Sequence, residues 1–133
     1  SRGVARGAIA HALEYSSQRK AFGRSIDRFG AIRAMHAEAA TAVEGARLLL
    51  WRAAGLLDAG KSAGREVSMA NLSAKQAAYK AGRDAVQILG GNGYSREYPV
   101  ERCYRDIQAL SPFGGGEDLQ KILVARSMAG VRS

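Results

Sequence analysis

Apolar residues recur every three or four positions along most of this chain, and this spacing constrains its fold more than any other feature of the sequence. Between residues 29 and 59, the apolar positions that would share one helix face are Ile32, Met35, Ala39, Val43, Ala46, Leu50, Ala53 and Leu57. β-Branched residues nowhere alternate with polar ones in the way that a half-buried strand requires. The sequence therefore predicts an all-α protein.

Glycine, serine and proline mark the expected helix ends. We expect helical segments over residues 1–20, 29–59, 62–89, 99–110 and 117–128. Gly60 stands where a glycine commonly follows a helix, Ser62 can cap the next helix, and Pro99 suits a first helical turn. Among these five segments, two long helices and two shorter ones, joined by short connections, predict an antiparallel four-helix bundle.

The chain has 133 residues, of which 47% are hydrophobic, so it is long enough for one domain with a buried core. A single cysteine, Cys103, excludes a disulfide framework and a metal site built from several thiolates. No apolar run approaches the ~18 residues of a membrane span. We therefore expect a soluble, cytoplasmic domain that has no membrane partner.

The charge of the chain is unusually positive. Twenty lysines and arginines against twelve acidic residues give a formal net charge of +8. Such a charge fits either a solvated basic surface or a polyanionic partner, such as a nucleic acid or a phosphate-bearing cofactor or substrate. The arginines are spread from Arg2 to Arg132 with no dense block, so a nucleic-acid-binding tail is not indicated and no nucleic-acid partner is expected.

The histidine and cysteine positions argue against metal or thiol chemistry. Di-iron sites in helical bundles need a glutamate three residues before a histidine, and neither His11 nor His36 has one. We expect no metal site, and we place both histidines at the surface or at an interface. Cys103 has no histidine near it in sequence, which favours an idle thiol over a nucleophile. Trp51 lies beside the apolar face of its helix and is expected to contribute to packing.

Two glycine-rich loops are candidate binding segments. Residues 87–93 (QILGGNG) place backbone without side chains at a helix end, which fits either a helix cap with a turn or the close approach of a ligand. Residues 114–116 are three glycines that lead into a helix N-terminus, where free N–H groups can receive an anion or a carbonyl oxygen. A flexible connector is the alternative for this second loop. Arg19 and Lys20, close to Phe22, add a cationic and aromatic surface.

Three segments together resemble the C-terminal helical domain of acyl-CoA dehydrogenases: residues 15–23 (YSSQRKAFG), 86–94 (VQILGGNGY) and 97–106 (EYPVERCYRD). The resemblance covers essentially all of residues 1–133. It implies a fragment of a flavoprotein whose complete chain adds an N-terminal helical domain and a middle β-domain. It also implies FAD bound at a subunit interface of a dimer or tetramer. The implied reaction oxidises an acyl-CoA to its 2,3-enoyl form and passes electrons to an electron-transfer flavoprotein.

The resemblance also implies which residues bind FAD. Arg19 matches the arginine that meets the pyrophosphate of the neighbouring subunit's FAD, and Phe22 sits in the same contact. Phe29 falls near the adenosine part, where the glutamine that usually follows is absent. The residues that match the segment lying along the dinucleotide are Gln87, Ile88, Leu89, Gly90 and Gly91. Gly116, Glu117 and Asp118 complete the expected cofactor contacts.

The chain departs from the family at the loop that carries the catalytic base. The usual pattern is Tyr-Glu-Gly-Thr, and its glutamate removes the α-proton of the thioester. Phe113 stands at the tyrosine position, Gly114 at the glutamate, Gly115 at the glycine and Gly116 at the threonine that contacts FAD. Phe113 and Gly115 are thus expected beside the substrate, but no catalytic residue is visible in this loop.

Three explanations of the missing base remain open. The base can come from the helix that precedes Tyr15, upstream of Ser1, as in the isovaleryl and long-chain types. Alternatively, the chain belongs to a non-catalytic partner subunit, or to a related flavin enzyme, such as a monooxygenase, that needs no base. A more remote alternative is a basic helical interaction module. In each case, we expect the isolated fragment to be inactive because the flavin-cradling β-domain is absent.

Overall fold

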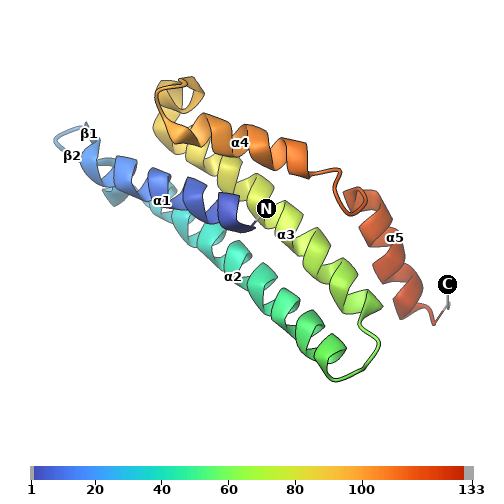
Figure 1. Cartoon of the computed structure of the whole chain (residues 1–133). Coiled ribbons are helices and arrows are strands. Elements are labelled where there is room, and N and C mark those ends of the chain that lie inside the picture. The colour runs from blue at the N-terminus through green and yellow to red at the C-terminus, as the bar shows by residue number, and fades with distance from the viewer. Residues whose placement is uncertain (1, 131–133) are drawn as a thin grey trace.

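The structure, a computed structural model, describes residues 2–130 and is built almost entirely from helices (Figure 1). The α-helices of the described residues are α1 (Arg2–Gln18), α2 (Gly30–Asp58), α3 (Gly64–Leu89), α4 (Pro99–Leu110) and α5 (Glu117–Met128). The predicted all-α fold is confirmed. Ser1 and residues 131–133 lie outside the described residues, and so do the expected helix start at Ser1 and the last residues of the expected domain.

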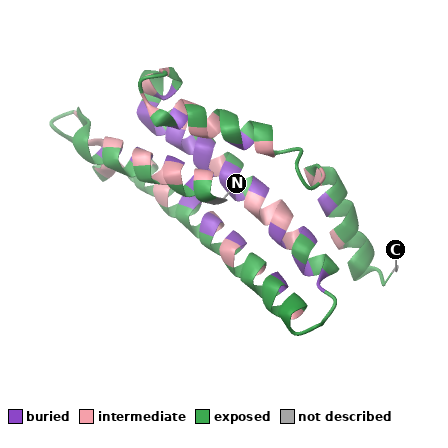
Figure 2. Cartoon of the chain, in the orientation of Figure 1, coloured by how far each residue is buried: buried purple, intermediate pink, exposed green. Residues whose placement is uncertain are grey.

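Helix α3 is the centre of the fold, because it packs against α1, α2, α4 and α5 (Figure 1). Small residues make this possible, and alanines of α3 contribute much of the core, including Ala77, Ala78, Ala81 and Ala85. A Cβ atom added at Gly82 would lie 2.8 Å from Ile107 Cδ1 of α4. Figure 2 shows the resulting buried stripe along α3.

Most helix ends agree with the expected boundaries. Gly60 follows the end of α2 with a left-handed φ of +68°, and Pro99 opens α4, as predicted. The expected cap at Ser62 is wrong: Ala63 occupies the N-cap position of α3, where no side chain can accept a helix N–H. The Ala63 carbonyl accepts from the Val67 N–H at 2.8 Å and so starts the helix.

The structure differs from the expected four-helix bundle in two places. Residues 20–25 form a two-stranded antiparallel hairpin of β1 (Lys20–Ala21) and β2 (Arg24–Ser25), followed by the short 3₁₀ helix η1 (Ile26–Arg28). Helix α1 packs on α2, α3 and α4, whereas α5 lies along the outer side of α3 (Figure 1). In α5 the one buried residue is Gln120.

The packing role expected of Trp51 does not place it in the core. Trp51 is 56% exposed, and the guanidinium of Arg47 lies 4.3 Å from its ring centroid. The two residues are four apart on α2, so they share the outer face of that helix. The stripe that does face the core holds Ala39, Val43, Ala46 and Ala53.

His36 links α2 to α1 and makes the stability of the domain sensitive to pH. Its Nε2 lies 3.1 Å from Oγ of Ser16, which is fully buried. Burial lowers the pKa of His36 below its ordinary value of 6.5, and the charge of Asp27 offsets this only in part. The unfolded chain therefore binds more protons than the folded one below pH 6.5, and stability is lost as the pH falls through the folded-state pKa.

We expect the urea midpoint of unfolding to be lower at pH 5 than at pH 7.5. Because His36→Gln removes the titrating group, that variant should show a smaller difference between the two midpoints. An equal pH dependence in the variant and the wild type would assign the effect to other groups.

Candidate functional site

The predicted site residues gather in two regions (Figure 1). One region, called here the hairpin end, contains the C-terminus of α1, the hairpin and the 3₁₀ helix η2 (Gly90–Tyr94) that follows α3. The other region is the glycine loop, residues 111–116, which joins α4 to α5 and lies beside α3. The sequence-predicted cofactor residues are thus divided between the hairpin end and the glycine loop.

The turn of the hairpin projects an aromatic and cationic surface. Phe22 and Gly23 form the turn with φ values of +51° and +77°, as in a type I′ turn. Phe22 is 97% exposed and its ring centroid lies 6.3 Å from that of Phe29. The Arg24 guanidinium lies 4.4 Å from the Phe29 centroid. A phenylalanine so exposed in a left-handed conformation favours a role in binding, because neither property helps the domain to fold.

Arg19 is held between α1 and the hairpin by its backbone. Its N–H donates to the Tyr15 carbonyl at 2.8 Å, and its carbonyl accepts from the Ile26 N–H at 2.9 Å. In the part of the chain that the structure describes, no carboxylate lies within 4 Å of its guanidinium nitrogens. Arg19 therefore offers a positioned cation with its charge available to a ligand.

The second part of the hairpin end is η2, whose glycines have different surroundings. A Cβ atom at Gly93 would lie 2.5 Å from the Val86 carbonyl oxygen, so this residue packs against α3. Gly90 and Gly91 face open space and border a surface depression of about 280 Å³. The residues that line it are Arg83, Val86, Gln87, Gly90, Gly91 and Tyr94.

Of the five predicted residues in this segment, Gln87, Gly90 and Gly91 border the depression. Ile88 and Leu89 are buried in the core, so a ligand in the depression can meet no more than their backbone. Sequence reasoning missed Arg83 and Tyr94. For Arg83 the signal was present, because it precedes Gln87 by four residues and therefore shares its helix face.

Tyr15 connects the two parts of the hairpin end. Its hydroxyl accepts from Asn92 Nδ2 at 2.9 Å, and its ring packs edge-on against Tyr98 with centroids 5.8 Å apart. Tyr15 lies one helical turn before Arg19, so these contacts fix the arginine relative to η2.

We expect Tyr15→Phe to lower the free energy of unfolding by about 1 kcal/mol, the usual net value of a hydrogen bond. Urea denaturation measures this, with exposed Tyr94→Phe as the control that should change little.

The glycine loop is built rather than flexible. Gly114 and Gly115 have φ values of +71° and +85°, and three side chains donate to their carbonyl oxygens. Asn71 Nδ2 and Gln120 Nε2 donate to the Gly114 carbonyl at 3.3 and 2.6 Å, and Lys75 Nζ donates to the Gly115 carbonyl. These contacts from α3 and α5 argue against the flexible-connector alternative.

The N–H groups of the glycine loop remain available. In a trans peptide the N–H points in the opposite direction to the carbonyl. Because the Gly114 and Gly115 carbonyls accept hydrogen bonds from α3 and α5, the N–H groups of Gly115 and Gly116 point away from these helices. Within the described residues, the N–H groups of Gly114, Gly115 and Gly116 have no acceptor. Gly116 is the N-cap of α5, so the helix terminus adds further donors. Such a cluster of N–H groups suits a carbonyl oxygen or an anion.

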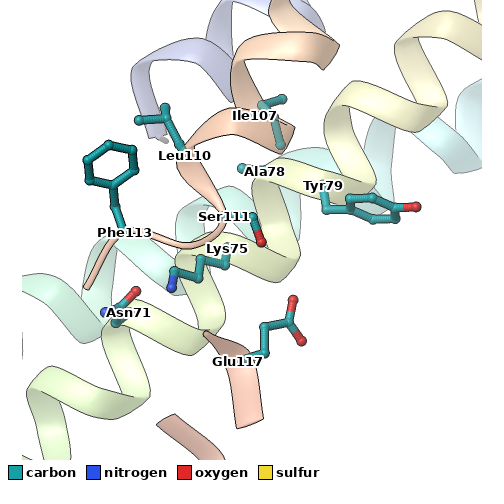
Figure 3. A pocket seen from close by; sticks show the side chains of 9 residues that line it. All are labelled: Asn71, Lys75, Ala78, Tyr79, Ile107, Leu110, Ser111, Phe113 and Glu117. Carbon is teal, nitrogen blue, oxygen red and sulfur yellow. The ribbon is translucent and has the colours of Figure 1, made fainter. Parts of the chain in front are cut away.

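A cavity of about 160 Å³ lies between the glycine loop and α3 (Figure 3). Its lining residues are Asn71, Lys75, Ala78, Tyr79, Ile107, Leu110, Ser111, Phe113 and Glu117. Glu117 Oε2 is 3.4 Å from Gln76 Nε2, and Lys121 lies within 4 Å of both Glu117 and Asp118. The two carboxylates at the start of α5 are therefore held by neighbouring side chains.

Cys103 has the surroundings of an idle thiol. Burial and the charge of Asp106 raise the pKa of Cys103 above its ordinary value, which keeps it protonated at neutral pH. Within residues 2–130 no three histidine, cysteine, aspartate or glutamate side chains cluster in a way that could hold a metal ion. No helix in that range is both long enough and apolar enough to cross a membrane.

Comparisons with known sequences identify similar proteins along nearly the whole chain. The sequence profile of the family described as acyl-CoA dehydrogenase, C-terminal domain, matches residues 1–129. An acyl-CoA dehydrogenase of Bacillus subtilis (strain 168) is 41% identical over 128 residues, which are 96% of this chain and 34% of that protein. The caffeyl-CoA reductase-Etf complex subunit CarC of Acetobacterium woodii is 42% identical over 123 residues, 92% of this chain and 32% of that protein. The chain thus spans about a third of the length of these curated relatives.

Solved structures show the same likeness. A glutaryl-coenzyme A dehydrogenase in complex with glutaryl-CoA matches with a TM-score of 0.94 and 38% identity, over 98% of this chain and 33% of that one. The FAD complex of PigA matches with a TM-score of 0.90 and 30% identity, over 98% of this chain and 34% of that one.

Proposed function

Because the chain belongs to the acyl-CoA dehydrogenase family, whose C-terminal domain it matches, we propose that it forms part of an FAD-dependent enzyme that oxidises an acyl-CoA to the 2,3-enoyl-CoA. The observation that carries this proposal is the hairpin end, where the same end of the domain holds an arginine without a carboxylate partner among the described residues, exposed aromatic rings and open glycine backbone. When bound, FAD supplies the electron acceptor for the oxidation. The complete protein would add the N-terminal helical domain and middle β-domain to residues 1–133, and we place it in the cytoplasm.

The chemistry of the hairpin end fits an anionic dinucleotide. Arg19 would pair with the diphosphate, since a guanidinium donates two parallel hydrogen bonds to phosphate oxygens. Phe22 and Phe29 would pack against the apolar parts of the cofactor. Gly90 and Gly91, which have no side chain and open space above them, would let the diphosphate approach the backbone. Gln87 and Arg83 border the same depression and would add polar contacts.

We expect Arg19→Met to weaken FAD binding by the complete protein about 10- to 100-fold, the worth of a charge-assisted hydrogen bond. Arg126→Met is the matched control, because Arg126 lies exposed on α5, away from the hairpin end. The dissociation constant can be measured by adding FAD to the deflavinated protein and following the flavin fluorescence. Equal losses in the two variants would argue against a specific role for Arg19.

The proposal includes a homo-oligomer, a dimer or a tetramer, because the domain exposes many large apolar side chains. On the second half of α2 and on α5 these are Leu48, Leu50, Trp51, Leu57, Leu119, Ile122, Leu123 and Met128. An apolar surface of this extent is usually covered in the working protein. Light scattering of the complete protein gives its mass, and a monomer would contradict this part of the proposal.

The glycine loop would meet the substrate and the flavin through Phe113, Gly115 and Gly116, with Glu117 and Asp118 following at the start of α5. Gly114 can accept no proton, so we place the catalytic base upstream of Ser1. Replacing that upstream carboxylate by glutamine should abolish turnover, and full activity would overturn the assignment.

We further propose an electron-transfer flavoprotein as the acceptor of the electrons, by analogy with the relative whose name includes an Etf complex.

The proposed function is tested with the complete protein, mixed anaerobically with a panel of acyl-CoAs while the flavin absorbance is followed. Bleaching by any acyl-CoA supports a dehydrogenase whose base lies outside the glycine loop. Bound flavin that no acyl-CoA bleaches supports a non-catalytic partner subunit or base-free flavin chemistry. A protein without flavin that binds DNA in a salt-sensitive way supports the interaction module instead.

A further inference from the structure

We propose that Lys75 places a buried positive charge behind the glycine loop and thereby raises the reduction potential of the flavin that this loop contacts. The inference rests on the proposed function, because the contact between the loop and FAD is part of that proposal. It assigns to Lys75 a positioning role that acts through the loop backbone.

Lys75 is an unusual lysine because the residue is only 8% exposed. It projects from α3 toward the glycine loop, where Ala78, Ile107 and Leu110 line the same cavity (Figure 3). Its one hydrogen bond within the described residues is to the Gly115 carbonyl, and no carboxylate of those residues lies within 4 Å of its Nζ. Burying an ammonium without a carboxylate is costly, so a purely structural contact would be better served by a neutral donor.

The Gly115–Gly116 peptide carries the effect of this charge across the loop. A hydrogen bond from an ammonium to the Gly115 oxygen polarises the peptide and makes the Gly116 N–H a stronger donor. That N–H points away from Lys75 and has no acceptor among the described residues. A ligand on the outer side of the loop therefore meets both a strengthened donor and the field of a cation held at low dielectric.

The absence of a carboxylate at position 114 increases this effect. The glycine loop has no ionisable group between residues 111 and 116. Glu117, which lines the same cavity, lies more than 4 Å from Lys75 Nζ and contacts Gln76 and Lys121 instead. A bound flavin gains electron density when it is reduced, and a nearby positive charge favours the reduced form. The charge of Lys75, rather than its hydrogen bond, is the property on which the inference depends.

The test is the midpoint reduction potential of the flavin in the complete protein, measured spectroelectrochemically for Lys75→Met, Lys75→Gln and Lys75→Arg. We expect Met and Gln to shift the two-electron equilibrium toward the oxidised flavin about tenfold, which corresponds to a potential lower by ~30 mV. Gln keeps a donor for the Gly115 carbonyl but has no charge, and Arg keeps the charge, so Arg should retain most of the wild-type potential. The control is Lys61→Met, which removes an exposed charge from the loop between α2 and α3.

The outcomes separate this inference from the proposed function. Bound flavin with equal potentials in wild type, Lys75→Gln and Lys75→Arg overturns the inference and leaves the proposed function intact. A complete protein that binds no FAD overturns both. If Lys75→Met does not fold, the pair of Gln and Arg variants still compares a neutral with a charged donor. An equal fall in the Lys61→Met control would show that net charge, and not the position of Lys75, sets the potential.

Discussion

Replacing Gly93 by alanine is expected to destabilise the domain by about 3 kcal/mol, the largest effect of a single methyl group that we predict. The added Cβ would lie 2.5 Å from the Val86 carbonyl oxygen and 2.9 Å from the Val86 Cα atom. These are backbone atoms of α3, so no rotation of a side chain can relieve the contact. Either η2 must move away from the helix or the last turn of α3 must open.

Urea denaturation of Gly93→Ala, followed by circular dichroism, measures this loss. Gly91→Ala is the matched control, because a Cβ at Gly91 meets no atom within 4 Å and its φ is not left-handed. The control should remain within about 1 kcal/mol of the wild type, since exposed substitutions of this kind are nearly neutral. Similar losses at both positions would mean that η2 does not pack against α3 as described.

Installing glutamate at position 114, where the family resemblance implies a catalytic base, is expected to cost about 2–3 kcal/mol rather than to create a working base. The φ of Gly114 is +71°, a conformation that side chains rarely adopt, and its Cβ would lie 2.9 Å from Asn71 Nδ2. Asn71 would have to move and give up its hydrogen bond to the Gly114 carbonyl. The conformation of the loop at position 114 thus favours glycine over any residue with a side chain.

Gly116→Glu is the control for Gly114→Glu, because it adds the same charge at a position with an ordinary φ and open space for a Cβ. Thermal unfolding should show a lower midpoint for Gly114→Glu than for Gly116→Glu. Adding Asn71→Ala to Gly114→Glu should recover only part of the loss, because the backbone strain remains. Equal midpoints for the two glutamate variants would show that the loop accommodates a side chain at position 114.

The helices were predictable because their signals are local. The spacing of apolar residues indicates each helix. Gly60 and Pro99 mark helix ends because each of these residue types favours the backbone conformation found there. The cap of α3 was not predictable in the same way. Serine is a good capping residue by type, but the helix begins one residue later than Ser62 predicts. The path of the connection between α2 and α3, rather than the residue type, determines where α3 begins.

The candidate site was predictable in part. Residues of the glycine loop and of η2 were found because glycine runs are visible in sequence. The contact between Lys75 and the Gly115 carbonyl was not, since it joins residues 40 apart and lysine normally indicates a solvated surface. The hydrogen bond between Tyr15 and Asn92 was not predicted either, because the two residues are 77 positions apart in sequence.

In the proposed oligomer, helix α5 would couple the association of subunits to the formation of the glycine loop. Gln120 is its one buried residue, and the same side chain donates to the Gly114 carbonyl. When α5 detaches from α3, the glycine loop loses this donor and keeps only those of Asn71 and Lys75, so docking of the helix favours the formed loop. Any domain or subunit that covers the outer face of α5 therefore also favours the formed loop, and a ligand on the loop favours association by the same free energy.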